Sequence, residues 1–181
     1  QILSETLNIK CNRISLDKNF DIPIGSTLKK IKEYDPDIIF IASPNNPTSN
    51  SFSKEKILEI IEKSDGLVVI DEAYADYSKT SFIQHLSKYN NLAILKTMSK
   101  VGFASLRVGF LITNKEAIEI INKVRLPYNL STLSNIIAQD FFDDDKKYIR
   151  DIQKIVKERE RLNILLKPVS YTHLTLPTTY G

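Results

Sequence analysis

Seven residues whose side chains can do chemistry lie beside short apolar runs of the sequence. They are an amide, a carboxylate, a phenol, two hydroxyls, an amine and a guanidinium: Asn46, Asp71, Tyr74, Thr97, Ser99, Lys100 and Arg107. A phosphorylated aromatic cofactor that forms an imine with a lysine would use the whole set, because it needs an uncharged amine, polar partners for its ring and a cation for its phosphate. Singly, each residue is a weak signal, since a lone lysine is usually a solvated surface side chain.

The apolar runs predict the strands that would bring these residues together. Residues 37–42, 67–70 and 92–95 are short and almost free of polar residues, which fits strands buried on both faces of a parallel sheet. Helical patterns near residues 53–63 and 81–88 separate them, so the expected topology is a series of right-handed βαβ crossovers. Ligands of such sheets bind outside the carboxyl ends of the strands, and we expect the site at that edge.

A break in this rhythm predicts a reversed strand. Only residues 96–105 separate the third run from the next one, 106–112, and this is too short for a crossover helix. The strand from residue 106 is therefore expected to run antiparallel to its predecessor. That reversal would return Arg107 to the edge that carries Lys100.

Capping residues predict where helices begin. Ser26 or Thr27 is expected to cap a short helix that ends before residue 36, while Ser53 and Asn114 are expected to cap helices near 53–63 and 115–124. Residues 9–16 alternate weakly and could form a strand. A helical region over 131–166 is expected to divide near the three aspartates at 143–145, because adjacent like charges suit a helix end better than its interior.

Composition narrows the class of protein. The chain has 181 residues, 42% of them hydrophobic, and its net charge of +3 is spread along the sequence, which gives no case for nucleic-acid binding. Its one cysteine, Cys11, excludes an internal disulfide framework and suggests a reducing, cytoplasmic compartment. No apolar run approaches the roughly 20 residues of a membrane span. Because the chain starts at Gln1 without an initiator methionine, we expect it to be a piece of a longer protein.

Four motifs, in this order and spacing, resemble the fold-type-I pyridoxal-phosphate aminotransferases (class I/II). They are Ser43–Thr48, Val69–Tyr74, Thr97–Lys100 and Leu106–Gly109. Within that group, Val124–Leu130 is similar to the histidinol-phosphate aminotransferases. The resemblance covers residues 1–166 and implies an α/β fold, a three-layer sandwich around a mostly parallel sheet.

The resemblance implies a catalytic role for Lys100, Asp71 and Tyr74, and a cofactor-binding role for Asn46. Lys100 would hold pyridoxal 5'-phosphate (PLP) as a Schiff base and, once released, move the proton during amino transfer. Asp71 would pair with the pyridine nitrogen and keep it protonated, so that the ring acts as an electron sink. Asn46 and Tyr74 would donate hydrogen bonds to the phenolate oxygen of the ring.

The resemblance also implies a phosphate site. Arg107 would clamp the phosphate bidentately, with the hydroxyls of Thr97 and Ser99 beside it. The competing interpretation of the two hydroxyls is ordinary turn chemistry at a strand end. One residue departs from the family pattern, because Ser49 stands where a glycine often follows Asn-Pro-Thr, and the turn must then tolerate a side chain. No metal site is expected.

The same resemblance predicts the organisation of the chain. Residues 1–147 would form a large cofactor-binding domain truncated at its N-terminus, and 148–168 a helix that leads to an absent small domain. Residues 169–181 are uncharged and rich in threonine, and we interpret them as a non-native translated tail. The parent would be a homodimeric transaminase that acts on a small amino compound and a 2-oxo acid, with histidinol phosphate and 2-oxoglutarate as the specific prediction. This piece itself is expected to be inactive, because the rest of the phosphate loop, the ring-stacking aromatic and the substrate-carboxylate arginine are missing.

Three other interpretations stay open from the sequence. A related PLP-dependent lyase or decarboxylase, such as one similar to threonine-phosphate decarboxylase, would use the same Lys100 and Asp71. An ATPase would also place acids after the apolar run at 67–70, although the sequence holds no Gly-x-x-x-x-Gly-Lys-Ser/Thr phosphate loop. A regulatory module fused to a DNA-binding domain would keep the fold without the catalysis.

Overall fold

The computed structural model describes residues 2–78, 80–144 and 146–166. Six α-helices, three 3-10 helices (η) and four strands follow one another along this part of the chain. In order they are α1 (Ile2–Thr6), α2 (Ile24–Tyr34), β1 (Ile38–Ala42), α3 (Lys54–Glu62), β2 (Leu67–Asp71), η1 (Ala75–Tyr77), η2 (Ile83–His85), β3 (Leu92–Thr97), η3 (Ala104–Leu106), β4 (Gly109–Ile112), α4 (Lys115–Val124), α5 (Thr132–Asp143) and α6 (Lys146–Leu166).

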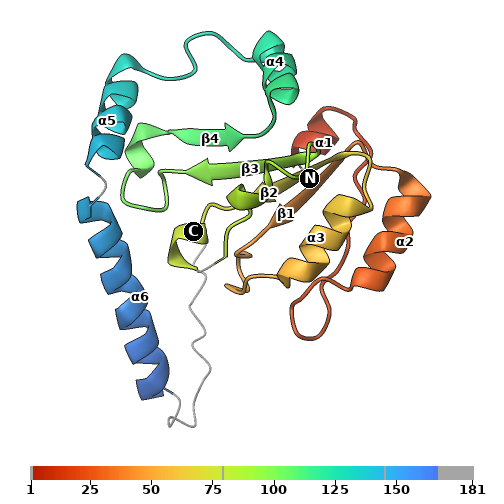
Figure 1. The fold of residues 1–181 in the computed structure, drawn as a ribbon, viewed down its shortest axis with the longest axis horizontal. Coiled ribbons are helices and arrows are strands. Elements are labelled where there is room, and N and C mark those ends of the chain that lie inside the picture. The colour runs from red at the N-terminus through yellow and green to blue at the C-terminus, as the bar shows by residue number, and fades with distance from the viewer. Residues whose placement is uncertain (1, 79, 145, 167–181) are drawn as a thin grey trace.

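The four strands form one sheet in the order β1-β2-β3-β4. β1 pairs with β2, and β2 with β3, in parallel, whereas β3 and β4 are antiparallel with Thr97 opposite Gly109. The arrows of β3 and β4 point in opposite directions in Figure 1. The predicted α/β fold with a mostly parallel sheet is confirmed, and so is the reversal of its last strand.

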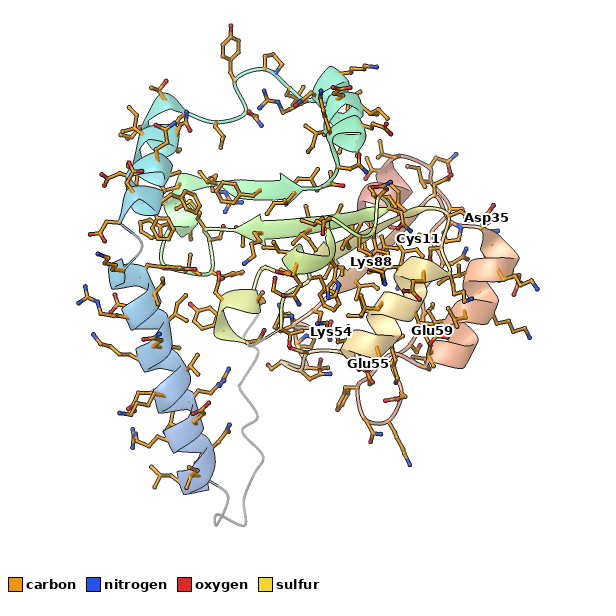
Figure 2. The ribbon with its side chains drawn as sticks, in the orientation of Figure 1. Cys11, Asp35, Lys54, Glu55, Glu59 and Lys88 are labelled. Atoms are coloured by element: carbon orange, nitrogen blue, oxygen red, sulfur yellow. The ribbon has the colours of Figure 1, made fainter. Side chains whose placement is uncertain are left out.

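Helices α2 and α3 lie side by side and cover one face of the sheet (Figure 1). The main core forms beneath them, because α3 turns Ile57, Ile60 and Ile61 inward and all three are at most 1% exposed. These side chains meet Val68, Ile70, Leu92 and Ile94 from alternating positions of β2 and β3. Figure 2 shows the charged Glu55 and Glu59 on the outer side of α3, away from this core.

The opposite face of β1 is uncovered within the described residues. Phe40 is 71% exposed and Ile38 is 52% exposed, whereas the central residues of β2 are buried. The prediction that the first strand is buried on both faces is therefore wrong for this part of the molecule, and the same prediction is confirmed for β2. The difference has a structural cause: β2 has a neighbour on each side, while β1 is an edge strand whose second face meets no helix among the described residues.

Helices α4 and α5 lie beyond β4, joined by an arched segment over residues 125–131 (Figure 1). α4 begins as predicted, because the Asn114 side chain accepts a hydrogen bond of 2.8 Å from the Ala117 N–H. α5 begins the same way, with the Ser131 hydroxyl accepting from the Ser134 N–H. The predicted division of the helical region is also confirmed, since α5 ends at Asp143 and α6 starts at Lys146.

Several local predictions are wrong. Residues 9–16 form no strand, because most of this segment is solvent-exposed and it pairs with no other strand. α2 begins before Ser26 and Thr27, whose hydroxyls turn back to the Pro23 carbonyl oxygen at 3.0 Å instead of capping the helix. Ser53 does stand at the N-cap position of α3, but its hydroxyl bonds to the Glu55 carboxylate. The helix predicted near 81–88 is only a short 3-10 turn.

A second, smaller cluster supports the end of the sheet near α5. Met98 and Val108 are almost fully buried and pack with Ala138 of α5, and partly buried phenylalanines pack against this cluster. Helix α6 continues from there away from the sheet (Figure 1). No helix among the described residues has the length and apolar character needed to cross a membrane. The predicted tail over 169–181 lies outside the described residues.

Candidate functional site

Asp71 is the last residue of β2 and stands at the carboxyl edge of the sheet. The ladder continues around it, with the Ser43 N–H donating to the Asp71 carbonyl at 3.0 Å and the Glu72 N–H donating to the Leu95 carbonyl at 2.9 Å. These bonds fix its backbone on both sides. Its carboxylate is half-buried, and one oxygen accepts from the Ala73 N–H at 2.9 Å. The second oxygen has no hydrogen-bond partner among the described residues.

Tyr74 and Lys100 meet across the ends of neighbouring strands. The Lys100 ammonium lies 5.4 Å from the centroid of the Tyr74 ring, within the distance of a cation–π contact. Neither the Lys100 ammonium nor the Tyr74 hydroxyl makes a hydrogen bond to another described residue. Lys100 is exposed and Tyr74 is half-buried, so both groups can reach a molecule bound at the edge.

A tight turn after β3 presents Lys100. The Thr97 hydroxyl accepts from the Ser99 N–H at 3.1 Å and lies 2.9 Å from the Ser99 hydroxyl, while the Val101 and Phe103 N–H groups both donate to the Met98 carbonyl. Gly102 has a φ of 103°, a left-handed conformation that suits glycine. The predicted turn chemistry of the two hydroxyls is therefore present, and it leaves hydroxyl lone pairs available for a ligand.

Arg107 reaches the same edge from the other side of the sheet. It lies two residues before β4, whose first residue pairs with Thr97, and its backbone is left-handed with a φ of 56°. Its guanidinium is exposed and makes one long contact, 3.5 Å, with the Ala104 carbonyl. The structure brings Arg107 to the turn region but shows no contact between it and the Thr97 or Ser99 hydroxyls.

Asn46 lies in the loop after β1 and is exposed. The loop is held by its neighbours, because the Asn45 amide donates to the Thr48 hydroxyl at 2.6 Å and the Ser49 N–H donates to the Asn45 carbonyl at 2.7 Å. Ser49 adopts a left-handed φ of 62°, so this turn does accept a side chain where glycine was expected. The Asn46 amide itself contacts no other described side chain.

The structure thus joins most of the predicted residues, and it shows no hydrogen bond between Asn46 or Arg107 and the other five. Asp71, Tyr74, Thr97, Ser99 and Lys100 occupy the adjoining ends of β2 and β3. Four side-chain groups there and nearby have no hydrogen-bond partner within the described chain: the Lys100 ammonium, the Tyr74 hydroxyl, one Asp71 oxygen and the Asn46 amide. Polar groups that converge without satisfying one another are typical of a binding site.

Sequence reasoning missed a buried polar cluster beneath the site. The Glu72 side chain is fully buried; its carboxylate accepts from the Phe82 N–H at 2.6 Å and the Ser81 hydroxyl at 2.8 Å, and it lies 4.0 Å from the Lys96 ammonium. Lys96 pairs more closely with Asp76, at 3.1 Å. The sequence did carry a signal for this cluster: Lys96 lies inside an apolar strand, and a lysine buried there requires a counter-charge.

A second missed residue is Tyr77, whose hydroxyl donates to the Lys100 carbonyl at 2.7 Å. Burial, together with the nearby Asp76 carboxylate, raises the pKa of the Tyr77 phenol. It therefore stays a hydrogen-bond donor near neutral pH. Nothing in the sequence marks this contact, because it joins residues 23 positions apart through the geometry of the loop.

An apolar cavity of about 550 Å³ lies along β4, apart from the seven candidate residues. Its walls come from β4, α4 and the arched segment: Lys96, Gly109, Phe110, Leu111, Ile112, Ile118, Ile121, Asn122, Arg125, Asn129, Leu130 and Phe142. None of the seven candidate residues lines it. Within residues 2–78, 80–144 and 146–166, no group of three His, Cys, Asp or Glu side chains could hold a metal ion.

This α/β fold, with a mostly parallel sheet and a reversed last strand, matches that of solved PLP-dependent transferases. The chain belongs to the aminotransferase class I and II family, whose sequence profile matches residues 5–176. It is 34% identical to a histidinol-phosphate aminotransferase of Parabacteroides distasonis over 180 residues, which are 98% of this chain and 52% of that protein.

Solved structures agree with this assignment. The fold is similar to the histidinol-phosphate aminotransferase of Clostridium acetobutylicum, with a TM-score of 0.84, 27% identity, and coverage of 94% of this chain and 53% of that one. It also resembles the histidinol-phosphate aminotransferase from Sinorhizobium meliloti in complex with pyridoxal-5'-phosphate, with a TM-score of 0.75, 20% identity, and coverage of 86% and 44%. The chain spans about half the length of the curated relatives it matches.

Proposed function

We propose that this chain is part of a PLP-dependent aminotransferase and carries the lysine to which the cofactor binds. One observation carries the proposal: Lys100 faces Tyr74 at 5.4 Å, Asp71 ends the adjoining strand β2, and all three keep polar groups without a hydrogen-bond partner among the described residues. Family membership supplies the identity of the ligand, because PLP is the cofactor that the aminotransferase family implies.

The donor set fits the aromatic part of the cofactor. PLP supplies an electron sink that stabilises charge developed on the carbon next to the transferred amino group. Lys100 would attach it covalently, and its amine would later move the proton. The free oxygen of Asp71 would hold the proton on the ring nitrogen, while Tyr74 and Asn46 would donate hydrogen bonds to the ring oxygen.

The turn after β3 fits the phosphate. Ser99 and Thr97 place two hydroxyls beside Lys100, and Arg107 supplies a guanidinium that no carboxylate pairs within the described residues. A guanidinium binds phosphate bidentately and would anchor it against the turn. This role requires the exposed Arg107 side chain to swing toward the hydroxyls, since it contacts Ala104 in the present structure.

The substrates follow from the relatives. Proteins that are 34–39% identical to this chain carry the name histidinol-phosphate aminotransferase. We infer that the whole protein transfers an amino group between histidinol phosphate and 2-oxoglutarate, in histidine biosynthesis. The chain spans about half of such proteins, so the rest of the site would come from the remainder of the protein.

The assembly and the domain division form part of the same proposal. We infer that the whole protein is a cytoplasmic homodimer, that residues 1–147 belong to its large domain, that 148–168 connect to a small domain, and that 169–181 are a non-native tail. Support for a partner surface comes from the segment between α4 and α5, where Leu126 is 75% and Tyr128 98% exposed. Figure 2 shows side chains of this arched segment on both of its sides, and three of them, Arg125, Asn129 and Leu130, line the cavity along β4.

The proposal is tested on the whole protein that contains this chain. Purified protein with added PLP is supplied with histidinol phosphate and 2-oxoglutarate, and glutamate formation is measured. Glutamate appears if the proposal is correct, and Lys100→Ala abolishes it while the exposed Lys115→Ala does not. If no glutamate forms, the protein is supplied with amino acids and their phosphates instead, and release of carbon dioxide or of a cleaved side chain from one of them would indicate a decarboxylase or a lyase.

A further inference from the structure

The 3-10 turn η1 connects the candidate site to helix α6. On one side, the Tyr77 hydroxyl donates to the Lys100 carbonyl at 2.7 Å. On the other, the Arg159 guanidinium of α6 donates to the Tyr77 carbonyl at 3.0 Å, a contact between residues 82 positions apart. One residue thus receives a bond from α6 and gives a bond to the backbone of the lysine.

A second pair of contacts fixes the same turn. The Asp76 carboxylate accepts from the Tyr148 hydroxyl of α6 at 2.8 Å through one oxygen, and from the Lys96 ammonium at 3.1 Å through the other. Burial and the hydrogen bond to Asp76 raise the pKa of the Tyr148 phenol well above its usual value. Tyr148 therefore remains a hydrogen-bond donor over the whole neutral range.

Lys100 needs this support because its ammonium makes no hydrogen bond to another described residue. Among the described residues, the contacts that reach Lys100 are the Tyr74 ring and the Tyr77 hydroxyl, and both come from the loop 74–77. The turn that carries it is held by the Val101 and Phe103 N–H groups on the Met98 carbonyl, and none of these hydrogen bonds is made by Lys100 itself. The position of the amine therefore depends on where the loop 74–77 lies.

We propose that Tyr77 is a positioning residue for Lys100, and that helix α6 sets the place of Tyr77 through Arg159 and Tyr148. This inference rests on the proposed function, because the position of the Lys100 amine matters for activity only if that amine binds the cofactor. A displacement of about 1 Å in a reacting group can cost about a hundredfold in rate, so a single hydrogen bond to the lysine backbone can matter for turnover more than for stability. A shift of α6 would then displace the Lys100 amine without any contact between α6 and the cofactor.

The test compares two matched tyrosine variants of the whole protein loaded with PLP. Tyr77→Phe removes the bond to Lys100, whereas Tyr89→Phe removes a hydroxyl that bonds to Glu62 at 2.6 Å, outside the site. We expect Tyr77→Phe to lower kcat about tenfold with little change in KM, and to shift the pH at which the absorbance band of the lysine-bound cofactor titrates. Tyr89→Phe should change neither.

Hydrogen exchange gives a readout that needs no cofactor. The Val101 and Phe103 amides bond to the Met98 carbonyl within the lysine turn, and they should exchange about fivefold faster in Tyr77→Phe than in wild type. Arg159→Gln, on α6, should also make the Val101 and Phe103 amides exchange faster than in wild type, by a smaller factor than Tyr77→Phe does. Arg161→Gln is its control, because Arg161 pairs with Glu158 on α6 itself; it should have no effect.

The outcomes separate the two proposals. If borohydride fixes no PLP to Lys100 in the wild type, the proposed function fails and the inference falls with it. If wild type is labelled but Tyr77→Phe keeps its kcat, its absorbance titration and its exchange rates, the positioning role alone is overturned. An effect of Tyr77→Phe without any effect of Arg159→Gln would overturn the part assigned to α6.

Discussion

Two regions of this molecule differ in how far their apolar side chains are buried. Beneath α3, Ile57 is fully buried and Ile60 is 1% exposed, and the strands complete the core. Beyond β4, α4 has a clear apolar stripe yet no buried residue, and Val124 is 79% exposed. Both helices are amphipathic by sequence, so the difference lies in what covers them.

The comparison shows which part of the fold is complete. The α2–α3 side holds its own core, whereas the region from α4 to α5 carries side chains patterned for burial whose covering surface is absent from the described residues. The candidate site lies between the two, on a turn that the buried Met98 and Val108 secure. We therefore expect the first region to govern the stability of this chain, and the second to govern what the chain associates with.

The largest effect is expected in the complete region. Ile60→Ala removes buried methylene groups and leaves a cavity under α3, so the free energy of unfolding should fall by about 3 kcal/mol. Chemical denaturation measures the loss. The matched change beyond β4, Ile120→Ala, truncates a side chain that is 63% exposed and should change stability by less than about 0.5 kcal/mol. Equal losses would show that α4 is as well covered as α3.

Glu72→Gln should have the next largest effect. The buried carboxylate accepts two hydrogen bonds and faces the Lys96 ammonium, so the amide leaves part of this cluster unsatisfied. A loss of about 2 kcal/mol is expected from denaturant unfolding, and the exposed Glu59→Gln serves as the control. Wild-type stability in Glu72→Gln would contradict the role assigned to the cluster.

A smaller, pH-dependent effect is expected at the ion pair that joins Lys56 of α3 to Asp21, in the segment before α2. Burial by itself would raise the pKa of Asp21, but the hydrogen bond from Lys56 at 2.7 Å and those from the Ile22 and Ser53 N–H groups outweigh it and lower the pKa below its usual 3.8. The pair thus contributes stability above pH 3.8, and the contribution is lost as the pH falls through the lower, folded-state pKa.

The variant Asp21→Asn makes this testable. It should cost about 0.5–1 kcal/mol at pH 7 and nothing at a pH below the folded-state pKa, as measured by unfolding at both values. Glu119→Gln, in an exposed pair on α4, should leave stability unchanged at either pH. A loss in Asp21→Asn that persists in acid would exclude the ion pair as its cause.

The smallest effect on stability is expected from the arched segment, where the effect on association should be largest. Leu126→Lys should leave the unfolding of this chain within about 0.5 kcal/mol of wild type, because the side chain is already 75% exposed. In the whole protein it should lower the mass measured by light scattering if this segment lies in the dimer interface. An unchanged dimer would place the interface elsewhere.

Local sequence signals predicted the sheet and most of its edge. Apolar runs without polar residues identified β1, β2 and β3, and the short link after Lys100 was enough to predict the reversal of β4. The Asn114 cap was also predictable, since its bond to Ala117 lies within one turn. These features depend on neighbours close in the sequence.

The failures concern contacts that sequence spacing does not encode. The alternation in residues 9–16 suggested a strand, but a strand needs a partner, and no strand of the part of the chain that the structure describes pairs with this segment. The exposure of Phe40 follows from what is missing over β1, and the bond from Tyr77 to Lys100 follows from how two loops meet. Such properties belong to the packing of distant segments, and a pattern within one segment cannot report them.

The most direct test of the account is to find the lysine that binds the cofactor. The whole protein is incubated with PLP, reduced with borohydride and digested, and the modified peptide is identified by mass spectrometry. The account predicts a single stable adduct on Lys100, and its loss together with the absorbance band in Lys100→Ala. An adduct on Lys96 or on any other lysine, or no adduct at all, would contradict it.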